Sequence, residues 1–332
     1  MKRILKAGIF AAVFLLYFIG VRANAPLQEE ISTVTLFLEN QGTDLAAARE
    51  ICRQEEEEEQ GEEDTGGALP LCFWGEEPNR TLTCRETGSS SIVTEILTWG
   101  SPQLILPEGE ALFLWEDGCL LDRETSFELF GTENAAGQIV WCQDKPCTVR
   151  GTFESSRNLM IRQVREEDGE TLRAVSMKLS DTDQAAAQTQ QFSLKYGLTG
   201  EWVDFIFWGA LAQDLLLLLP GILCGAGVRQ LARTGREMGT SWGKAAFYLG
   251  GGLLGVGAVL VLSGYFTVPA SMIPGEWSDF SFWEDFWDRQ RSNLLTILQT
   301  AQGEAQLTML GHFGISVLGS ISSAVGCGMM LK

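Results

Sequence analysis

The sequence predicts a membrane protein with four transmembrane α-helices and a mixed α+β extracytoplasmic domain inserted between helices 1 and 2. Four apolar segments are each long enough, at about 1.5 Å per residue, to cross a hydrocarbon core about 30 Å thick. They are Ile4–Val21, Val203–Val228, Ala245–Val268 and Thr308–Leu331. Between the first two lies a polar stretch, residues 22–201, with 34 acidic and 14 basic side chains. The predicted domains are therefore an anchor (1–21), an extracytoplasmic domain (22–201) and a three-helix membrane domain (202–332).

The charges beside the apolar segments predict which side each connection faces, because basic residues near spans stay in the cytoplasm. The basic residues are Lys2, Arg3 and Lys6 before the first segment, then Arg229, Arg233, Arg236 and Lys244 in a predicted short cytoplasmic loop, 229–244. The outer connection, residues 269–307, holds six acidic and two basic side chains. The alternation predicts a multi-pass protein of the cell membrane, surrounded by lipid, with both termini cytoplasmic.

The first segment has a second interpretation as a cleaved signal peptide. Lys2 to Lys6 resembles a basic n-region, Ala7–Gly20 is apolar, and Ala23-Asn24-Ala25 has the A-x-A pattern of a cleavage site. Pro26 would directly follow the cut and hinder the peptidase. Retention as an anchor and cleavage both remain open, and both leave the downstream sidedness unchanged.

Charge and cysteine content fit an exterior domain. The chain has a net charge of −19 and no basic stripe, which argues against a nucleic-acid partner. Six of its eight cysteines lie in residues 22–201, in a compartment that can oxidise them. The first bridge that we expect joins Cys142 and Cys147 across a turn; the alternative is that all six are reduced core residues.

The exterior domain begins with an alternating strand, Ile31–Leu38. Asp44 is expected to cap a helix that ends in the acidic run Glu55–Asp64, a solvated loop. A second helix is predicted over Ser91–Trp99. Short apolar runs predict the remaining elements, at Leu69–Trp74, Thr81–Cys84, Leu104–Leu106 and Ala111–Trp115.

The stretch Cys119–Gly151 predicts a strand end, a helix over Arg123–Phe130 that stops at Gly131, and a hairpin. The hairpin is expected to pair Gln138–Cys142 with Cys147–Gly151 across Gln143–Pro146. The glycines serve turns and the apolar residues serve packing. None of these residues is chemically reactive, so the pattern indicates a fold and no active site.

This stretch resembles the extracytoplasmic core domain of macrolide-exporter-type ABC permeases, the MacB/FtsX-like group. The matching residues are Leu129, Phe130 and Gly131, then Gly137 with Ile139 or Val140, then Thr148, Val149 and Gly151. The order of spans and domain is similar too, and Arg233–Gly239 is similar to a motif that follows the second span in that family. The resemblance implies a permease subunit that a separate ABC ATPase drives, with Arg229, Arg233, Arg236 and Lys244 facing the ATPase. The alternative for these four basic residues is that they are topology signals alone. The rival function is a membrane-anchored accessory or sensor protein without an ATPase.

Within the membrane, Gly221-x-x-x-Gly225 and Gly251-x-x-x-Gly255 permit close helix contacts, either in a homo- or hetero-dimer or inside the four-helix unit. Asp214 lies near the middle of the second predicted span, where we expect it to contact another helix. Pro220 is expected to kink that helix. An outer amphipathic helix, 281–302, begins at the capping box Ser281–Glu284, and Gly303 is its expected terminator. It is expected at the membrane–water interface or under the exterior domain.

The residue types needed for the common catalytic mechanisms are missing from the sequence. Position 238 is methionine where a Walker A motif needs its first glycine, and the single histidine, His312, lies in the last apolar segment. No C-x-x-C pair suggests a zinc site. We therefore expect no enzyme, no metal and no cofactor.

Overall fold

The computed structural model describes residues 2–39, 42–61, 70–106, 112, 118–155, 157–165, 169–274, 281–299 and 304–330. The chain forms two compact units. The helical unit comprises Met1–Ile31, Phe205–Asp279 and Thr308–Lys332, and the sheet domain comprises Ser32–Asp204 and Phe280–Leu307. The predicted outer helix therefore groups with the sheet domain, whereas the sequence analysis assigned it to the membrane domain.

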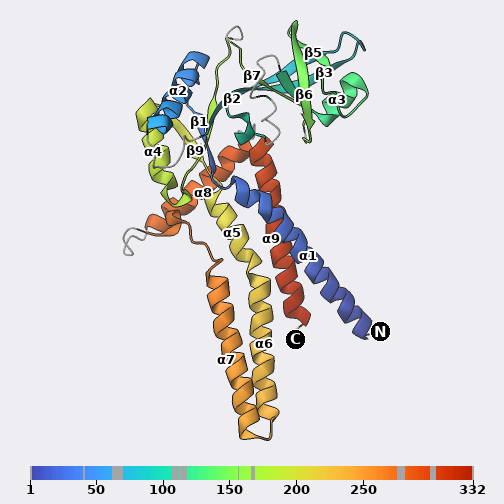
Figure 1. Cartoon of the computed structure of the whole chain (residues 1–332), viewed down its shortest axis with the longest axis vertical. Coiled ribbons are helices and arrows are strands. Elements are labelled where there is room, and N and C mark those ends of the chain that lie inside the picture. Colours follow the sequence, from blue (N-terminus) through green and yellow to red (C-terminus); the bar gives the residue numbers. More distant parts are fainter. Residues whose placement is uncertain are drawn as a thin grey trace. The chain divides into compact units, whose positions relative to one another are not determined.

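The helical unit contains four helices that are long and apolar enough to cross a membrane: Gly8–Glu30, Ile206–Glu237, Ser241–Ser263 and Thr308–Met330. The corresponding elements are α1 (Lys2–Glu30), α5 (Ile206–Leu216), α6 (Leu218–Glu237), α7 (Ser241–Ser263) and α9 (Glu304–Met330) (Figure 1). The four predicted spans are confirmed by length and composition, and the chain is a multi-pass membrane protein.

Two helices of this unit run further than predicted. Helix α1 continues past Val21 to Glu30, and α6 continues to Glu237. The predicted basic loop 229–244 is therefore wrong in form, because only residues 238–240 connect α6 to α7. Arginine, leucine and alanine favour helix, so residues 229–237 extend α6. Thr240 then starts α7, where its Oγ1 accepts the Gly243 N–H at 3.3 Å.

The expected kink near Pro220 is a break between α5 and α6 at Leu217. Proline has no N–H to donate to the carbonyl of Leu216, four residues earlier. The Leu217 N–H instead closes a tight turn onto the Asp214 carbonyl at 3.1 Å.

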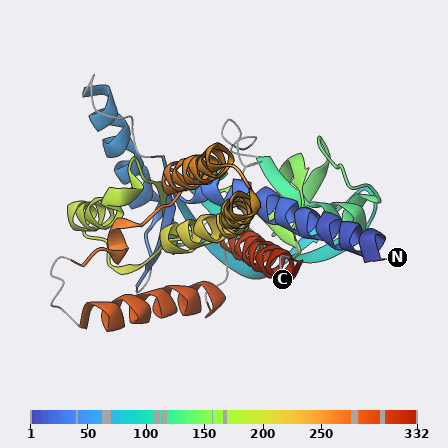
Figure 2. The same cartoon turned by 90° about the horizontal axis from the view of Figure 1, so that it is seen from below.

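Glycines permit the closest helix approaches in the helical unit. A Cβ on Gly319 of α9 would lie 2.8 Å from the Leu16 carbonyl oxygen and 3.0 Å from the Gly20 nitrogen of α1. Figures 1 and 2 show these two helices side by side. Of the predicted motifs, Gly251 and Gly255 face Val228 of α6, whereas nothing lies within 4 Å of a Cβ on Gly225. The second motif therefore packs α7 on α6 within one chain.

The described strands of the sheet domain form one nine-stranded sheet, in the order β3-β7-β4-β6-β5-β2-β8-β1-β9. The strands are β1 (Thr33–Leu38), β2 (Leu71–Thr83), β3 (Ser90–Gly100), β4 (Gly118–Asp122), β5 (Ile139–Cys142), β6 (Lys145–Phe153), β7 (Leu159–Gln163), β8 (Ala174–Lys178) and β9 (Gly200–Val203). The helices are α2 (Leu45–Gly61), α3 (Arg123–Phe130), α4 (Ala185–Tyr196) and α8 (Ser281–Gln299) (Figure 1). Because β3 also pairs with β2, six strands close into a circuit, and β8, β1 and β9 extend from it.

The predicted helix Ser91–Trp99 is wrong, because these residues form β3. Ile92, Val93 and Thr94 are β-branched and favour the extended backbone. Strand β3 pairs antiparallel with β2 and parallel with β7. The local sequence pattern is compatible with a helix or a strand, and pairing with these two neighbours selects the strand.

The first part of the acidic run, residues 55–61, is helical where it was expected to be a loop, since α2 extends to Gly61, and residues 62–64 lie outside the described residues. The N-cap is as predicted: the Ala47 N–H donates to Asp44 Oδ1 at 2.7 Å. Lys195 of α4 donates to Glu55 and Glu58 of α2, at 2.7 Å each, and offsets the repulsion among the carboxylates. The run Ala111–Trp115 and the terminator Gly303 lie outside the described residues, except for Leu112.

A buried ion pair links three strands of the circuit. Glu95 of β3 is 1% exposed, and its Oε1 accepts from Arg162 Nε of β7 at 2.6 Å. Arg80 of β2 approaches the other Glu95 oxygen at 3.5 Å and binds Glu170 at 2.6 Å. A buried charge without a partner is costly, so this network requires β2, β3 and β7 to be assembled together.

Replacing Glu95 by alanine should leave Arg162 buried without its carboxylate and cost about 3–5 kcal/mol. In the full chain in detergent, amide hydrogen exchange in β3 and β7 should accelerate by more than about a hundredfold. The control is Glu154→Ala, which removes the exposed partner of Arg123 and should cost less than about 1 kcal/mol. Equal exchange in the two variants would contradict a role for the buried pair.

Candidate functional site

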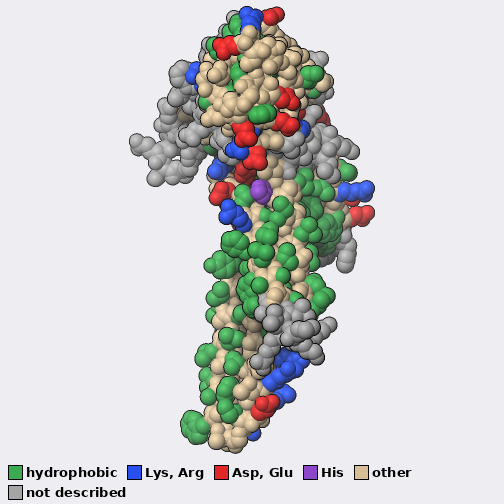
Figure 3. Space-filling model, turned by 90° about the vertical axis from the view of Figure 1, so that its right-hand side faces the viewer, with side chains coloured by type: hydrophobic (Ala, Val, Ile, Leu, Met, Phe, Trp, Pro, Cys, Tyr) green, Lys and Arg blue, Asp and Glu red, His purple; other side chains and the backbone are tan. Residues whose placement is uncertain are grey.

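The closed end of the α6–α7 hairpin carries a basic surface, which we call the basic tip: Arg229, Arg233, Arg236 and Lys244. The three arginines recur at intervals of four and three residues, so they share one face of α6. All four side chains are exposed. Figure 3 shows Lys and Arg side chains gathered toward one end of the helices, next to a band of hydrophobic side chains.

The basic tip stands on a closely packed helix pair. Gly235 of α6 is buried, and a Cβ there would lie 3.1 Å from the Phe247 Cβ of α7. Beside the arginines, Trp242 is 89% exposed at the start of α7. A large exposed aromatic residue next to arginines is the composition typical of a protein interface.

Asp214 lies at the other end of this hairpin. It lies nine residues into the candidate span Ile206–Glu237, close to the break between α5 and α6 at Leu217. Its predicted position near the middle of a span stays a prediction. Asp214 Oδ1 accepts the Thr267 N–H at 3.0 Å, and Gln213 Nε2 donates to the Tyr265 carbonyl at 3.1 Å. Together they tie the end of α5 to the chain that follows α7.

The residues of the predicted fold pattern make packing and backbone contacts in the sheet domain. Leu129 is buried in the core and Phe130 packs against it. Gly131 has a φ of 72° at the end of α3, a left-handed conformation that favours glycine. The Gly137 N–H donates to the Val149 carbonyl at 2.7 Å, and Thr148 pairs with Gly118. A Cβ on Gly151 would lie 3.2 Å from Leu120 Cδ2, so glycine permits the contact between β4 and β6.

The predicted hairpin forms with a tighter turn than expected. Strand β5 pairs with β6 through Cys142 opposite Lys145 and Val140 opposite Cys147, so only Gln143 and Asp144 make the turn. Both turn residues have positive φ, as a two-residue hairpin requires. Cys142 and Cys147 are thus diagonal neighbours and not directly opposite. Each cysteine is a thiol in the structure, and the Cys142–Cys147 bridge stays a prediction.

Helix α8 presents aromatic side chains outward. Its buried face contains Phe286, Gln290 and Asn293, whereas Trp283 and Trp287 are exposed. Within the sheet domain, Glu201 of β9 accepts hydrogen bonds from Ser292 and Thr296 of α8, at 2.8 Å each. The exposed tryptophans suit the expected position at the membrane–water interface. The hydrogen bonds to Glu201 fit the other expected position, against the exterior domain.

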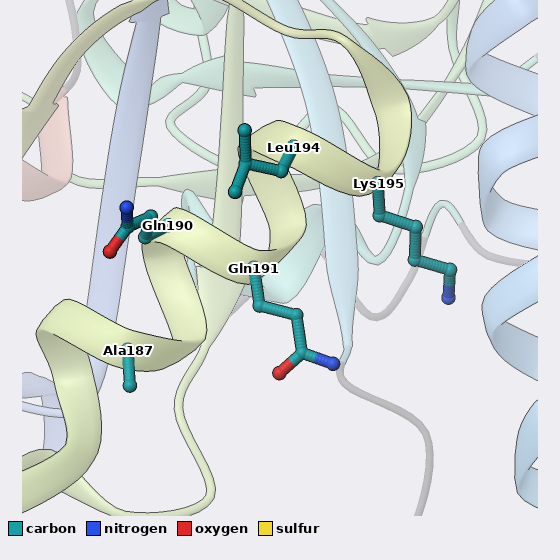
Figure 4. Close-up of a pocket in the computed structure, with 5 residues that line it drawn as sticks. All are labelled: Ala187, Gln190, Gln191, Leu194 and Lys195. Carbon is teal, nitrogen blue, oxygen red and sulfur yellow. The ribbon is translucent and has the colours of Figure 1, made fainter.

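An open hollow lies along the outer face of α4. Its lining comprises Ala187, Gln190, Gln191, Leu194 and Lys195, which Figure 4 shows projecting from one helix. Lys195 is held by Glu55 and Glu58, and its pKa is raised above the ordinary value by these hydrogen bonds against the effect of burial. The other four side chains are not ionisable. The described lining therefore offers surface contact and no catalytic group.

No metal-binding group of three or more His, Cys, Asp or Glu side chains occurs among the described residues. Sequence reasoning missed the Glu95–Arg162 pair and the place of Cys119 beside the hairpin cysteines. Both arise from pairing between strands that are far apart in the chain. A charged residue inside each apolar strand, Glu95 and Arg162, was the available signal for the first.

The fold defines a multi-pass membrane protein with a mixed sheet domain. Among solved structures, the chain is similar to the periplasmic region of MacB from Actinobacillus actinomycetemcomitans, with 14% identity over 52% of this chain and 88% of that chain and a TM-score of 0.38. It is also similar to the extracellular domain of the noncanonic ABC-type transporter YknZ from Gram-positive bacteria, with 12% identity over 51% and 97% and a TM-score of 0.37. No protein-family model and no curated protein matches the chain.

Replacing Asp214 by alanine should free the Thr267 amide, whose exchange should accelerate about tenfold for the loss of one charge-assisted hydrogen bond. Asp214→Asn keeps an accepting oxygen and is the matched control, with most of the protection retained. Hydrogen exchange of residues 264–268 measures both variants. Unchanged protection in Asp214→Ala would show that the carboxylate does not hold this segment.

Proposed function

We propose that this chain is a non-enzymatic transmembrane permease subunit of an ABC-transporter-like complex, which transmits the motion of a separate ABC ATPase to its extracytoplasmic sheet domain. The basic tip, both chain termini and the ATPase lie in the cytoplasm in this proposal. The sequence resemblance to MacB/FtsX-like permeases suggests the class, and the connections between the two units support the mechanism.

The observation that carries the proposal is that two short connections enter adjacent strands. Only residues 31 and 32 separate α1 from β1, and only residues 204 and 205 separate β9 from α5. Strands β1 and β9 are hydrogen-bonded to each other over Thr35–Leu38. In the helical unit, Gln28 Nε2 of α1 donates to the Gly209 carbonyl of α5 at 3.0 Å. Helices α1 and α5 are therefore joined to each other and continue into one paired edge of the sheet.

The mechanism needs no substrate pathway through the helices. A force on the basic tip acts on the α6–α7 pair, whose packing at Gly235 resists sliding. Asp214 and Gln213 connect the far end of that pair to α5. Helix α5 then pulls on β9, and β1 and α1 follow. The mechanical work is done on a partner or substrate outside the membrane.

The rival function, an accessory or sensor protein without an ATPase, is favoured by one observation. The connection between α6 and α7 has only three residues, 238–240, so it provides no separate domain for an ATPase to hold. The basic tip would then serve topology alone. The two functions differ in what the tip binds, which the first experiment tests.

Replacing Arg229, Arg233 and Arg236 together by alanine should reduce the recovery of an ABC ATPase with the tagged chain at least tenfold. The chain is purified from its native membrane in mild detergent, and the ATPase is quantified by mass spectrometry. The control is Arg123→Ala, which removes an exposed arginine of the sheet domain and should leave recovery unchanged. Equal recovery from both variants, or no ATPase with the wild-type chain, supports the rival function.

The proposed sidedness predicts opposite labelling of two introduced cysteines. Gly239→Cys, between α6 and α7, should react with a membrane-impermeant maleimide only after the membrane is opened. Glu154→Cys, at a side chain that is 85% exposed in the sheet domain, should react in intact cells. The wild-type chain measures the background from its own cysteines. Reversal of the two results would invert the topology.

A further inference from the structure

Four of the described cysteines belong to one buried cluster: Cys84, Cys119, Cys142 and Cys147. Three of them lie on adjacent strands, Cys119 on β4, Cys142 on β5 and Cys147 on β6, whereas Cys84 directly follows β2. Cys119 pairs in register with Val149, two residues from Cys147, and alternate residues of a strand share a face. Cys142 is the diagonal neighbour of Cys147 on the other side. Cys147 can therefore meet either of two cysteines, one from each adjacent strand.

The contacts of the three thiols distinguish the two pairings. The Cys142 thiol turns to Glu95 and donates to its Oε1 at 3.7 Å. Burial, with the nearby Glu95 charge, raises the pKa of Cys142 to about 12, so this thiol keeps its proton. Cys147 instead accepts a hydrogen bond from the Cys119 thiol and lies 3.8 Å from Arg165 Nη2.

The charges around Cys147 favour its thiolate. The Cys119 hydrogen bond is the largest influence that lowers the pKa of Cys147, and Arg165 and Arg162 act in the same direction, against burial and the more distant Glu95. The same hydrogen bond, together with burial, raises the pKa of Cys119 well above its ordinary value. Of the two thiols, Cys147 is therefore the one that loses its proton more readily, and Cys119 is the hydrogen-bond donor.

A small pocket gives access to this sulfur. Its lining is Cys142, Gln143, Lys145, Cys147, Arg162 and Arg165, and its volume is about 10 Å³. A space of this size holds about one water molecule. Glutathione disulfide or a protein disulfide is far too large to enter, and even hydrogen peroxide, with two oxygen atoms, requires the lining side chains to shift slightly.

We propose that Cys119 and Cys147 form an oxidisable dithiol, in which Cys147 reacts first with hydrogen peroxide and Cys119 then closes the disulfide. The Cys147 thiolate attacks one peroxide oxygen, the O–O bond breaks, and the departing hydroxide takes up a proton to become water. Cys147 is then a sulfenic acid. The Cys119 sulfur, losing its proton, attacks the Cys147 sulfur; the S–O bond breaks and a second water leaves. Two thiols are oxidised by two electrons, and one peroxide is reduced to two waters.

Digestion before aspartate tests the proposal, because it places the three cysteines on separate peptides: 117–121, 122–143 and 144–167. The full-length protein in detergent is reduced, freed of reductant, treated with equimolar peroxide and digested without reduction. The expected product is peptide 117–121 linked to 144–167. A link between 122–143 and 144–167 would overturn the proposal in favour of the Cys142 pairing, and three unmodified thiols would overturn it outright.

Two cysteine variants assign the roles within the pair. In Cys119→Ser the reaction should stop at a sulfenic acid on Cys147, which dimedone traps in peptide 144–167. In Cys142→Ser, the matched control, the 117–121 link should still form. Each variant is first compared with the wild type by circular dichroism. Loss of the link in Cys142→Ser, with an unchanged spectrum, would contradict the proposed pairing.

Arg165 is a positioning residue in this proposal, and its test is a pH profile. Arg165→Gln removes a positive charge beside Cys147, which should raise the pH midpoint of the oxidation rate and slow the reaction at pH 7 several-fold. Arg165→Lys should recover most of the rate. A purely structural role would lower stability and leave the pH midpoint where it is in the wild type.

Discussion

The pairing of β1 with β9 is the constraint on which the rest of the molecule depends. The two shortest connections between the helical unit and the sheet domain join α1 to β1 and β9 to α5. The antiparallel hydrogen bonds between β1 and β9 fix the distance between the points where α1 ends and α5 begins. Within the helical unit, the hydrogen bond from Gln28 to the Gly209 carbonyl holds α1 against α5. The two connections are therefore held close to each other at both ends, by strand pairing in the sheet domain and by this hydrogen bond in the helical unit.

The interior of the sheet domain is organised by charge as much as by apolar packing. Glu95 accepts from Arg162 and orients the Cys142 thiol, so one carboxylate serves both the strand circuit and the cysteine cluster. Buried ion pairs contribute little net stability compared with apolar packing, but they strongly penalise any arrangement that separates the partners. We infer that Glu95 selects the register of β3 between β2 and β7.

The sequence was sufficient where local chemistry decides the structure. Length and hydropathy predicted four spans, and Asp44 and Gly131 predicted helix ends. The hairpin over β5 and β6 was predicted too, with a turn of four residues where the structure has two. The sequence was insufficient where distant residues decide. The pattern of Ser91–Trp99 fits a helix, but the segment forms β3 because it pairs with β2 and β7. Glu55 and Glu58 remain in a helix because Lys195 of α4 donates hydrogen bonds to both carboxylates. For the candidate site, the basic residues were found, but their spacing on one helical face was hidden while they were assigned to a loop. Cys119 was missed as a partner because strand order cannot be read from local pattern.

The closed strand circuit has a consequence for solubility outside the membrane. Open sheet edges present unpaired backbone groups on which other chains can build. Here β3 pairs on both sides, and β9 is the terminal strand of the described sheet. Strand β9 is only four residues long, and α8 lies against it through the hydrogen bonds to Glu201. The described part of the domain thus offers little exposed edge for strand addition, which protects it from edge-to-edge aggregation.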